Sequence, residues 1–331
     1  MIRATELTIV ASAILMSCAT APPPPEPASG AEPAASSAQV EVATTVAFTE
    51  GPTVDQEGNV YFTDVRNSRI MKLPVDGGVT VFRQPSNHAN GLIFDDQWRL
   101  LACEGSSAEL GKAQVTRTDL SSGKIEVIAD RFEGKRLNST NDLTIDSQGR
   151  IYFTDRPGEI VAPDQVPVHA VYRIDPDGSI AQIIKAPDIE MPNGIVISPD
   201  DKTLYLIEAN GDEGGARMIR AYDLQADGSV TNMRVHYNFY PGRSGDGMTI
   251  DSEGNLYVAA GLHRRRGTSE TLDTKCGVHV ITPEGELKDF IPIPEDVITN
   301  CAFGGPDLKT LYVTAGKTLF KVKVDVPGTR R

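Results

Sequence analysis

The stretch that decides the fold runs from Asn138 to Asp155 and reads Asn-Ser-Thr-Asn-Asp-Leu-Thr-Ile-Asp-Ser-Gln-Gly-Arg-Ile-Tyr-Phe-Thr-Asp. It opens with amides and an acid, and a short apolar run follows at residues 143–145. A turn signal at residues 146–149 separates that run from a second one at residues 151–154. β-Branched and aromatic runs separated by Asp, Ser and Gly are typical of a β-hairpin. We therefore expect a hairpin whose first strand begins with polar side chains.

The same pattern occurs six times along the chain. The copies begin 40, 51, 52, 53 and 54 residues apart, at Glu50, Asn90, Asn141, Asn193, Asp246 and Asn300. Two further β-prone runs follow each of the first five hairpins, and no amphipathic helix of any length is evident. A repeat of roughly 40–50 residues with several strands is typical of a β-propeller. The sequence predicts an all-β, six-bladed propeller.

The two ends of the repeat region are expected to meet. The last copy contains three evident strands, whereas a β-prone run at residues 40–48 precedes the first copy. A propeller that is not closed leaves exposed sheet edges. We predict that residues 40–48 supply the outer strand of the last blade, within one propeller domain of residues 40–326.

The first residues are typical of a bacterial export signal. Arg3 precedes an apolar run at residues 7–16 that is too short to cross a bilayer. Leu-Met-Ser-Cys at residues 15–18 resembles a lipobox, which predicts a lipid-anchored protein acylated at Cys18; ordinary secretion is the alternative. The segment 19–39 is rich in Pro, Ala and Ser, so we expect a disordered tether. Together these features predict a periplasmic protein that meets the membrane through a lipid anchor.

The net charge and the cysteines limit the partners, disulfides and metal sites that we expect. The net charge of −13 disfavours nucleic acid as a partner. Cys103 is expected to be a small buried side chain, while Cys276 and Cys301 lie in adjacent repeats and are candidates for a disulfide. No spacing typical of a zinc site is present. We expect a monomer with a small-molecule substrate.

The six copy starts define the candidate site. Each copy places a carboxylate or amide where the innermost strand of a blade begins, so the six side chains should surround the axis at one end. Oxygen ligands of this kind suit a hard cation. Taken singly, Asn-Gly and Asp-Gly pairs are often turn chemistry, but six registered copies with two acids favour a site. The longer insertions follow the second strand of a copy and should wall a pocket on the same face.

Several motifs carry a resemblance to a known family. They are Glu50-Gly-Pro, the run 87–92 (Asn-His-Ala-Asn-Gly-Leu), the run 133–142 with its Asn-Asp pair, Pro192-Asn-Gly-Ile, Asp246-Gly-Met, and the run 303–316. From residue 50 to residue 324 the chain resembles the gluconolactonase branch of the regucalcin (senescence marker protein)/gluconolactonase/luciferin-regenerating-enzyme family. The resemblance implies a six-bladed propeller that binds one divalent cation at its axis and hydrolyses sugar lactones.

The resemblance also implies roles for particular residues. The cation ligands would be Glu50, Asn141, Asn193 and Asp246, and Asp246 would double as the general base. The side chains expected to contact the substrate are Asn90, Asn138, Asn141, Glu104 and His88. Two positions depart from the family pattern: Gly105 stands where a His is usual, and Arg156-Pro-Gly follows Asp155 where Pro-Pro-Tyr-Gly is usual. Both departures fall on the pocket side, so the substrate is left open.

The residue types suggest a chemistry. Two carboxylates and two amides can neutralise a divalent cation, with calcium expected first and zinc or magnesium as alternatives. The cation would polarise a lactone carbonyl, and Asp246 would activate water or pass a proton to the ring oxygen. A hydroxide generated by the cation is the alternative nucleophile. The leading hypothesis is an aldonolactone hydrolase; a related propeller esterase or phosphotriesterase and a non-catalytic metal-binding propeller are the alternatives.

Overall fold

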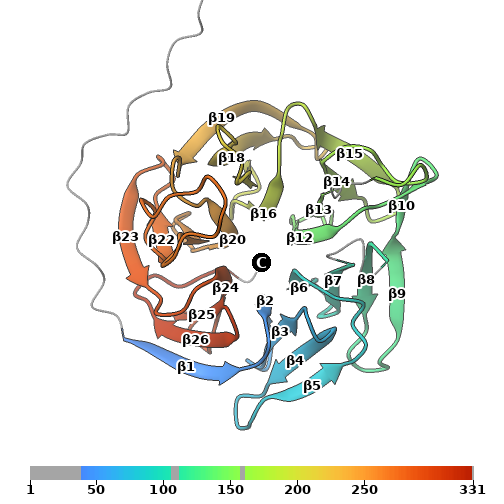
Figure 1. Ribbon diagram of the computed structural model, residues 1–331. Coiled ribbons are helices and arrows are strands. Elements are labelled where there is room, and N and C mark those ends of the chain that lie inside the picture. The colour runs from blue at the N-terminus through green and yellow to red at the C-terminus, as the bar shows by residue number, and fades with distance from the viewer. Residues whose placement is uncertain (1–38, 106–111, 157–160, 330–331) are drawn as a thin grey trace, which may run out of the picture. The chain divides into compact units, whose positions relative to one another are not determined.

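The computed structural model describes residues 39–105, 112–156 and 161–329, and these residues form six four-stranded antiparallel sheets around a central axis (Figure 1). The described residues contain no helix, and so none that could cross a membrane. The predicted six-bladed propeller is confirmed. The predicted leader, Cys18 and nearly all of the tether lie outside the described residues.

Each blade is built from consecutive strands that run from the axis to the rim. Blade 1 consists of β2 (Thr49–Val54), β3 (Val60–Asp64), β4 (Arg69–Leu73) and β5 (Thr80–Arg83). Blade 2 consists of β6 (Leu92–Phe94), β7 (Leu100–Glu104), β8 (Gln114–Thr118) and β9 (Ile125–Ala129). Blade 3 consists of β12 (Thr140–Ile145), β13 (Ile151–Asp155), β14 (Ala170–Ile174) and β15 (Ile180–Lys185).

The next blades repeat this order. Blade 4 consists of β16 (Pro192–Ile197), β17 (Thr203–Ala209), β18 (Arg217–Leu224) and β19 (Val230–Asn238). Blade 5 consists of β20 (Gly245–Ile250), β21 (Leu256–Ala260), β22 (Gly277–Ile281) and β23 (Leu287–Pro292). A small hairpin of β10 (Arg131–Phe132) and β11 (Lys135–Arg136) precedes blade 3 and was not expected from the sequence.

Blade 6 joins the two ends of the described chain. It consists of β24 (Ile298–Gly304), β25 (Thr310–Ala315), β26 (Thr318–Lys323) and, outermost, β1 (Val40–Thr45). β1 pairs antiparallel with β26 in a register that sets Val40 against Val322 and Thr45 against Thr318. The backbone N–H of Val46 donates to the carbonyl of Lys317 at 2.6 Å. The predicted closure by an N-terminal strand is therefore confirmed.

The inner strands approach one another closely around the axis. β-Bulges lie near the start of five of them, β2, β12, β16, β20 and β24, where the register shifts. A bulge redirects the side chain beside it. The glycine after the polar residue is required by the packing: a Cβ at Gly194 would lie 2.6 Å from the carbonyl oxygen of Asp246, and one at Gly247 would overlap the side chain of Asn300. The Asn-Gly and Asp-Gly pairs thus serve contact between blades, not only turn formation.

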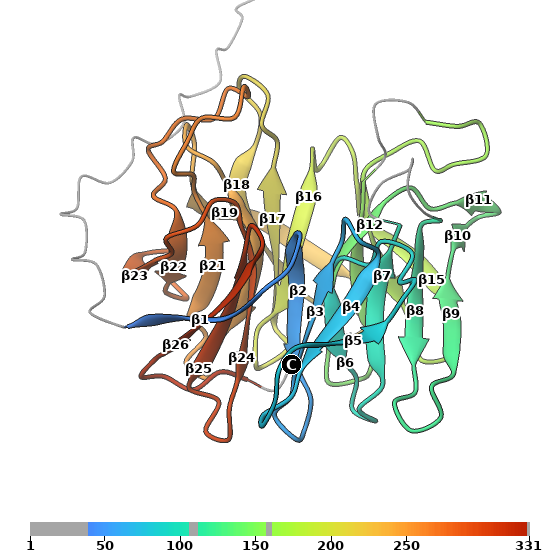
Figure 2. The ribbon, with the colours of Figure 1, turned by 60° about the horizontal axis from the view of Figure 1, so that its bottom comes forward.

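The hairpin turns and the insertions lie on opposite faces of the propeller. The described parts of the loops after β13, β17 and β21 extend from the upper face in Figure 2, whereas the β2–β3 and β24–β25 turns lie at the lower face. At the lower turns, aspartates accept backbone N–H groups of their own turn, as Asp146 does from Gln148 and Arg150. The predicted placement of the insertions on the same face as the strand starts is confirmed for these loops.

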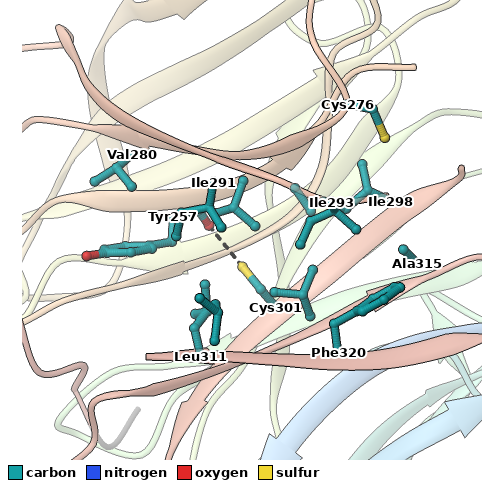
Figure 3. Packing of buried hydrophobic residues seen from close by; sticks show 14 of the residues in the cluster. Tyr257, Cys276, Val280, Ile291, Ile293, Ile298, Cys301, Leu311, Ala315 and Phe320 are labelled. Carbon is teal, nitrogen blue, oxygen red and sulfur yellow. Dashed lines mark hydrogen bonds between the residues drawn. The ribbon is translucent and has the colours of Figure 1, made fainter. Parts of the chain in front are cut away.

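The blades pack through apolar clusters between neighbouring sheets. The cluster between blades 5 and 6 contains Cys276 and Cys301, which lie apart among aliphatic and aromatic side chains (Figure 3). Cys301 donates from Sγ to the carbonyl of Tyr257 at 3.2 Å, and Cys276 contacts the carbonyl of Glu295 at 3.7 Å. Both cysteines are free, as is the buried Cys103. The structure therefore does not contain the disulfide that the sequence left open.

Candidate functional site

The polar residues that begin the six inner strands line the axis on the face that carries the insertions. Five of the six are buried, and Asp246 is half-buried. Backbone contacts link neighbours: the N–H of Gly91 donates to the carbonyl of Asn141 at 2.9 Å, and the hydroxyl of Thr154 donates to the carbonyl of Asn193 at 3.0 Å. The polar side chains are therefore positioned by contact between adjacent blades.

Two of the four predicted cation ligands are in direct contact. Nδ2 of Asn193 donates to Oδ1 of Asp246 at 2.7 Å. Oδ1 of Asn193 accepts no hydrogen bond from another residue that the structure describes. The amide is thus oriented by Asp246 while its oxygen stays available to a ligand.

Glu50 faces the same group across the axis. One carboxylate oxygen accepts the N–H of Gly51 at 2.9 Å. Burial, and next the negative charges of Asp246 and Asp142, raise the pKa of Glu50 well above its usual value. Mutual repulsion of this kind indicates carboxylates gathered without enough positive charge between them.

Asn141, the fourth predicted ligand, is buried with an uncommitted side chain. It is 3% exposed, and its amide makes no hydrogen bond with another described residue; the same holds for Asn90, which is 9% exposed. Buried amides are normally hydrogen-bonded. An amide at the axis that lacks a protein partner suits a site whose ligand or water completes the bonding.

Asp142 occupies the position that is glycine in most copies. Its Oδ1 accepts the N–H of Leu143 at 2.9 Å, as expected for a residue that bonds its own strand, and its Oδ2 faces the amide of Asn300 at 3.5 Å. Burial, partly offset by these hydrogen bonds, raises the pKa of Asp142 to about 7, and the charge of Asp246 adds to the rise. Asp142 therefore adds a third carboxyl group at the axis, whose charge changes with pH near neutrality.

Two arginines were not anticipated as parts of this site. Arg243 forms an ion pair with Asp246, with Nη2 2.7 Å from Oδ2. Arg156 is half-buried, and it interacts electrostatically with Asp246, Glu50, Asp155 and Asp142. Arg243 is the one Lys or Arg within three residues of any of the six copy starts, and that position could have singled it out.

The donor set fits a divalent cation. The groups at the axis are carboxyl groups, amides and guanidinium groups, and four acids (Glu50, Asp142, Asp155 and Asp246) face two arginines. Among the described residues, no group of three or more His, Cys, Asp or Glu side chains could hold a metal alone. A cation held at the axis would therefore also need the amide oxygens of Asn141 and Asn193, and an all-oxygen set of this composition suits calcium or magnesium better than a soft metal.

The predicted substrate contacts divide into two groups. Asn138 is 2% exposed; it donates through Nδ2 to Asp155 at 2.9 Å, and its Oδ1 is buried without a partner. Nδ1 of His88 lies 2.8 Å from the carbonyl of Val65. Asn138 thus has a buried acceptor without a partner, whereas one His88 nitrogen is engaged with the β3–β4 turn of blade 1.

Glu104 is held between blades 1 and 2. Its carboxylate forms an ion pair with Arg83, accepts the hydroxyl of Thr116 at 2.6 Å, and accepts the amides of Gln114 at 2.8 Å and Asn87 at 3.3 Å. It is 3% exposed. These contacts engage both oxygens of Glu104, so a substrate would have to replace one of them to bind this carboxylate.

Sequence comparison identifies the group of proteins to which this propeller is related. The profile described as the SMP-30/Gluconolactonase/LRE-like region matches residues 48–317. The chain belongs to the SMP-30/gluconolactonase/LRE-like family. The match covers the six inner-strand starts and the strands from β2 to β25, while β26 and β1, the two outer strands of blade 6, lie outside it. The expected family is confirmed.

Relatives within the SMP-30/gluconolactonase/LRE-like family include named lactonases. A gluconolactonase of Zymomonas mobilis is 30% identical, with 87% of this chain and 81% of the relative covered. The pentonolactonase of Haloferax volcanii is 25% identical, with 80% of each covered. A solved gluconolactonase structure from Xanthomonas campestris superposes with a TM-score of 0.72 at 29% identity, with 88% of this chain and 90% of that chain covered.

Proposed function

We propose that the protein is a lactonase that opens sugar lactones of the glucono-1,5-lactone type with the help of one divalent cation at the propeller axis. The observation that carries the proposal is the gathering of Glu50, Asn193 and Asp246 at the axis of a chain that belongs to a family with named lactonases. Calcium is the ion expected first, with magnesium and zinc as alternatives.

In this proposal, Glu50, Asn141, Asn193 and Asp246 hold the cation. When bound, the cation supplies Lewis acidity toward the lactone carbonyl. The protein's own part is to place the ring beside Asp246, which takes a proton from the attacking water or returns one to the ring oxygen as it leaves. The unpartnered Oδ1 of Asn138 would accept a hydroxyl of the sugar, and the uncommitted amide of Asn90 would bind water or substrate.

The proposal is tested by lactone hydrolysis followed with a pH indicator. Purified protein should open glucono-1,5-lactone after calcium is added and should lose that activity in EDTA. Asp246→Asn should lower kcat by about 100-fold or more, and it should keep the propeller's circular dichroism spectrum. Paraoxon is run in parallel. Hydrolysis of paraoxon without lactone opening would replace the proposal by a phosphotriesterase, and cation binding without any turnover would leave a binding protein.

A further inference from the structure

Arg243 differs from the other buried or half-buried arginines in the kind of acid with which it pairs. Arg69, Arg83 and Arg220 each pair with an acid at the end of the second strand of a blade, which is their own blade for Arg69 and Arg220 and the next blade for Arg83. Arg150 pairs with Asp146 in a lower-face turn. Arg243 instead pairs with Asp246, at the start of an inner strand. It is the one ion pair that such a start makes among the described residues.

Backbone carbonyls fix the guanidinium of Arg243. Arg243 is 8% exposed, and Nη1 donates to the carbonyl of Ile298 at 3.0 Å and reaches that of Gly261 at 3.4 Å. These two carbonyls lie at the start of β24 and just after β21. The guanidinium therefore bridges blades 5 and 6 while its Nη2 faces Asp246, so it cannot turn away without losing contacts to both blades.

The segment that carries Arg243 is itself held by a second buried arginine. Arg217 is fully buried, and it donates to the carbonyls of Pro241 at 2.8 Å, Asn210 at 2.9 Å and Asp212 at 2.7 Å. The N–H of Thr271 also donates to the carbonyl of Pro241, at 3.0 Å. The backbone two residues before Arg243 is thus fixed by a cation whose described hydrogen-bond partners are all neutral.

The two oxygens of Asp246 therefore have different neighbours. Oδ2 faces Arg243, and Oδ1 faces the amide of Asn193, on the side of the other expected ligands. The charged groups around Asp246 from every packed element are Glu50, Asp142, Arg156, Arg243 and Arg266. Arg243 alone among them is in contact with the carboxylate.

We propose that Arg243 is a positioning residue that shares Asp246 with the cation, holding one carboxylate oxygen so that the other is presented to the axis at a fixed angle. This inference rests on the proposed function. An arginine in this role should change cation affinity, which a purely structural arginine would not do. A positive charge next to a ligand opposes the binding of a second positive charge, so Arg243 weakens cation affinity while it improves the geometry of the reaction.

The test compares Arg243→Met and Arg243→Lys with the wild type. For Arg243→Met we expect calcium to bind about tenfold more tightly in calorimetry, while kcat for glucono-1,5-lactone falls about 100-fold because the carboxylate is no longer oriented. KM should change little. Arg243→Lys keeps the charge and should restore wild-type calcium affinity with part of kcat. The proposal therefore predicts that calcium affinity rises while kcat falls in Arg243→Met.

The matched control is Arg220→Met. Arg220 pairs with Glu208 at 2.9 Å, and its side chain is 12% exposed against 10% for Arg243. Removing it should lower the melting temperature to a similar degree and leave calcium affinity and kcat unchanged. Weaker calcium binding in Arg243→Met, an unchanged kcat, or no calcium binding by the wild type would overturn the inference. If the wild type binds calcium but opens no lactone, the proposed function fails, and the direction of the affinity change still decides whether Arg243 shares Asp246 with the cation.

Discussion

His279 gives a sharp prediction about stability and pH. It lies on β22, 6% exposed, between the rings of Phe239 and Phe290. Its Nε2 is 2.9 Å from the carbonyl of Lys275, and its Nδ1 has no partner. Burial lowers the pKa of His279 from 6.5 to about 4. The imidazole is therefore neutral in the folded blade, and protonation would place a charge in an apolar cluster.

The sign and size of the effect follow from that pKa difference. Because the folded pKa lies below the unfolded one, the unfolded chain binds more protons between pH 6.5 and pH 4, and stability falls as the pH falls through this window. The free energy of unfolding should lose about 2 kcal/mol from this group at about pH 5 and about 3 kcal/mol at about pH 4. That is a large share of the 5–15 kcal/mol of a typical domain.

The assay is urea unfolding of the wild type and His279→Gln, in EDTA, at about pH 7.5 and about pH 5. Gln keeps a donor for the carbonyl of Lys275 but cannot take up a proton. The wild type should lose about 2 kcal/mol relative to the variant over this interval. His236→Gln is the control, because His236 is less buried and its pKa is also lowered by burial; its effect should be smaller. A wild-type-to-variant difference that does not change with pH would refute the reasoning.

Three further predictions concern the site and the closure. Gly247→Ala should lower the melting temperature by several degrees and weaken calcium binding, because the new Cβ overlaps the side chain of Asn300. Thermal scans and calorimetry would measure these two effects. The control is Gly254→Ala, at a lower-face turn with positive φ, which should destabilise the protein without changing calcium affinity. Glu50→Gln should raise the melting temperature in EDTA, since a buried carboxylate that repels its neighbours is removed, and should abolish the rise caused by calcium; a lower melting temperature in EDTA would contradict this. Deleting residues 1–46 removes β1 and exposes the edge of β26. Scanning calorimetry should then show a melting temperature lower by about 5–10 °C, and size-exclusion chromatography should show self-association of the shortened protein. An unchanged monomer peak and melting temperature would contradict a stabilising role of β1.

The blade architecture was accessible from the sequence because it is repeated. Each copy places β-branched and aromatic runs around a polar turn, which is Asp-x-x-Gly in three copies, and the six copies support one another even where one is weak, as at residues 90–104. The role of β1 followed from a general constraint, since an unpaired edge on β26 would be unfavourable. The hairpin β10–β11 has no counterpart in the other blades, so no repeat could indicate it.

The site was predictable in part. The residue types at the strand starts indicated which oxygens lie at the axis, but the sequence does not specify which of them have partners. Glu104 and Asn138 both looked like pocket residues; the structure commits Glu104 to Arg83 and leaves Oδ1 of Asn138 without a partner. Such differences depend on side-chain direction across strands that are distant in sequence. The guanidinium of Arg243 is held by the carbonyls of Ile298 and Gly261, and a sequence pattern does not indicate that these residues lie together.

The closure of blade 6 also determines where a fusion partner or a solid support can be attached to the propeller. β1 is the outermost strand, at the rim (Figure 1), and the opposite end of the described chain reaches Thr329, whose N–H meets the carbonyl of Ile250 at the end of β20, away from the strand starts. Within residues 39–329, neither β1 nor the segment ending at Thr329 lies on the face that carries the insertions (Figure 2). A fusion partner or solid support joined directly before β1 or directly after Thr329 should therefore leave that face accessible to small molecules.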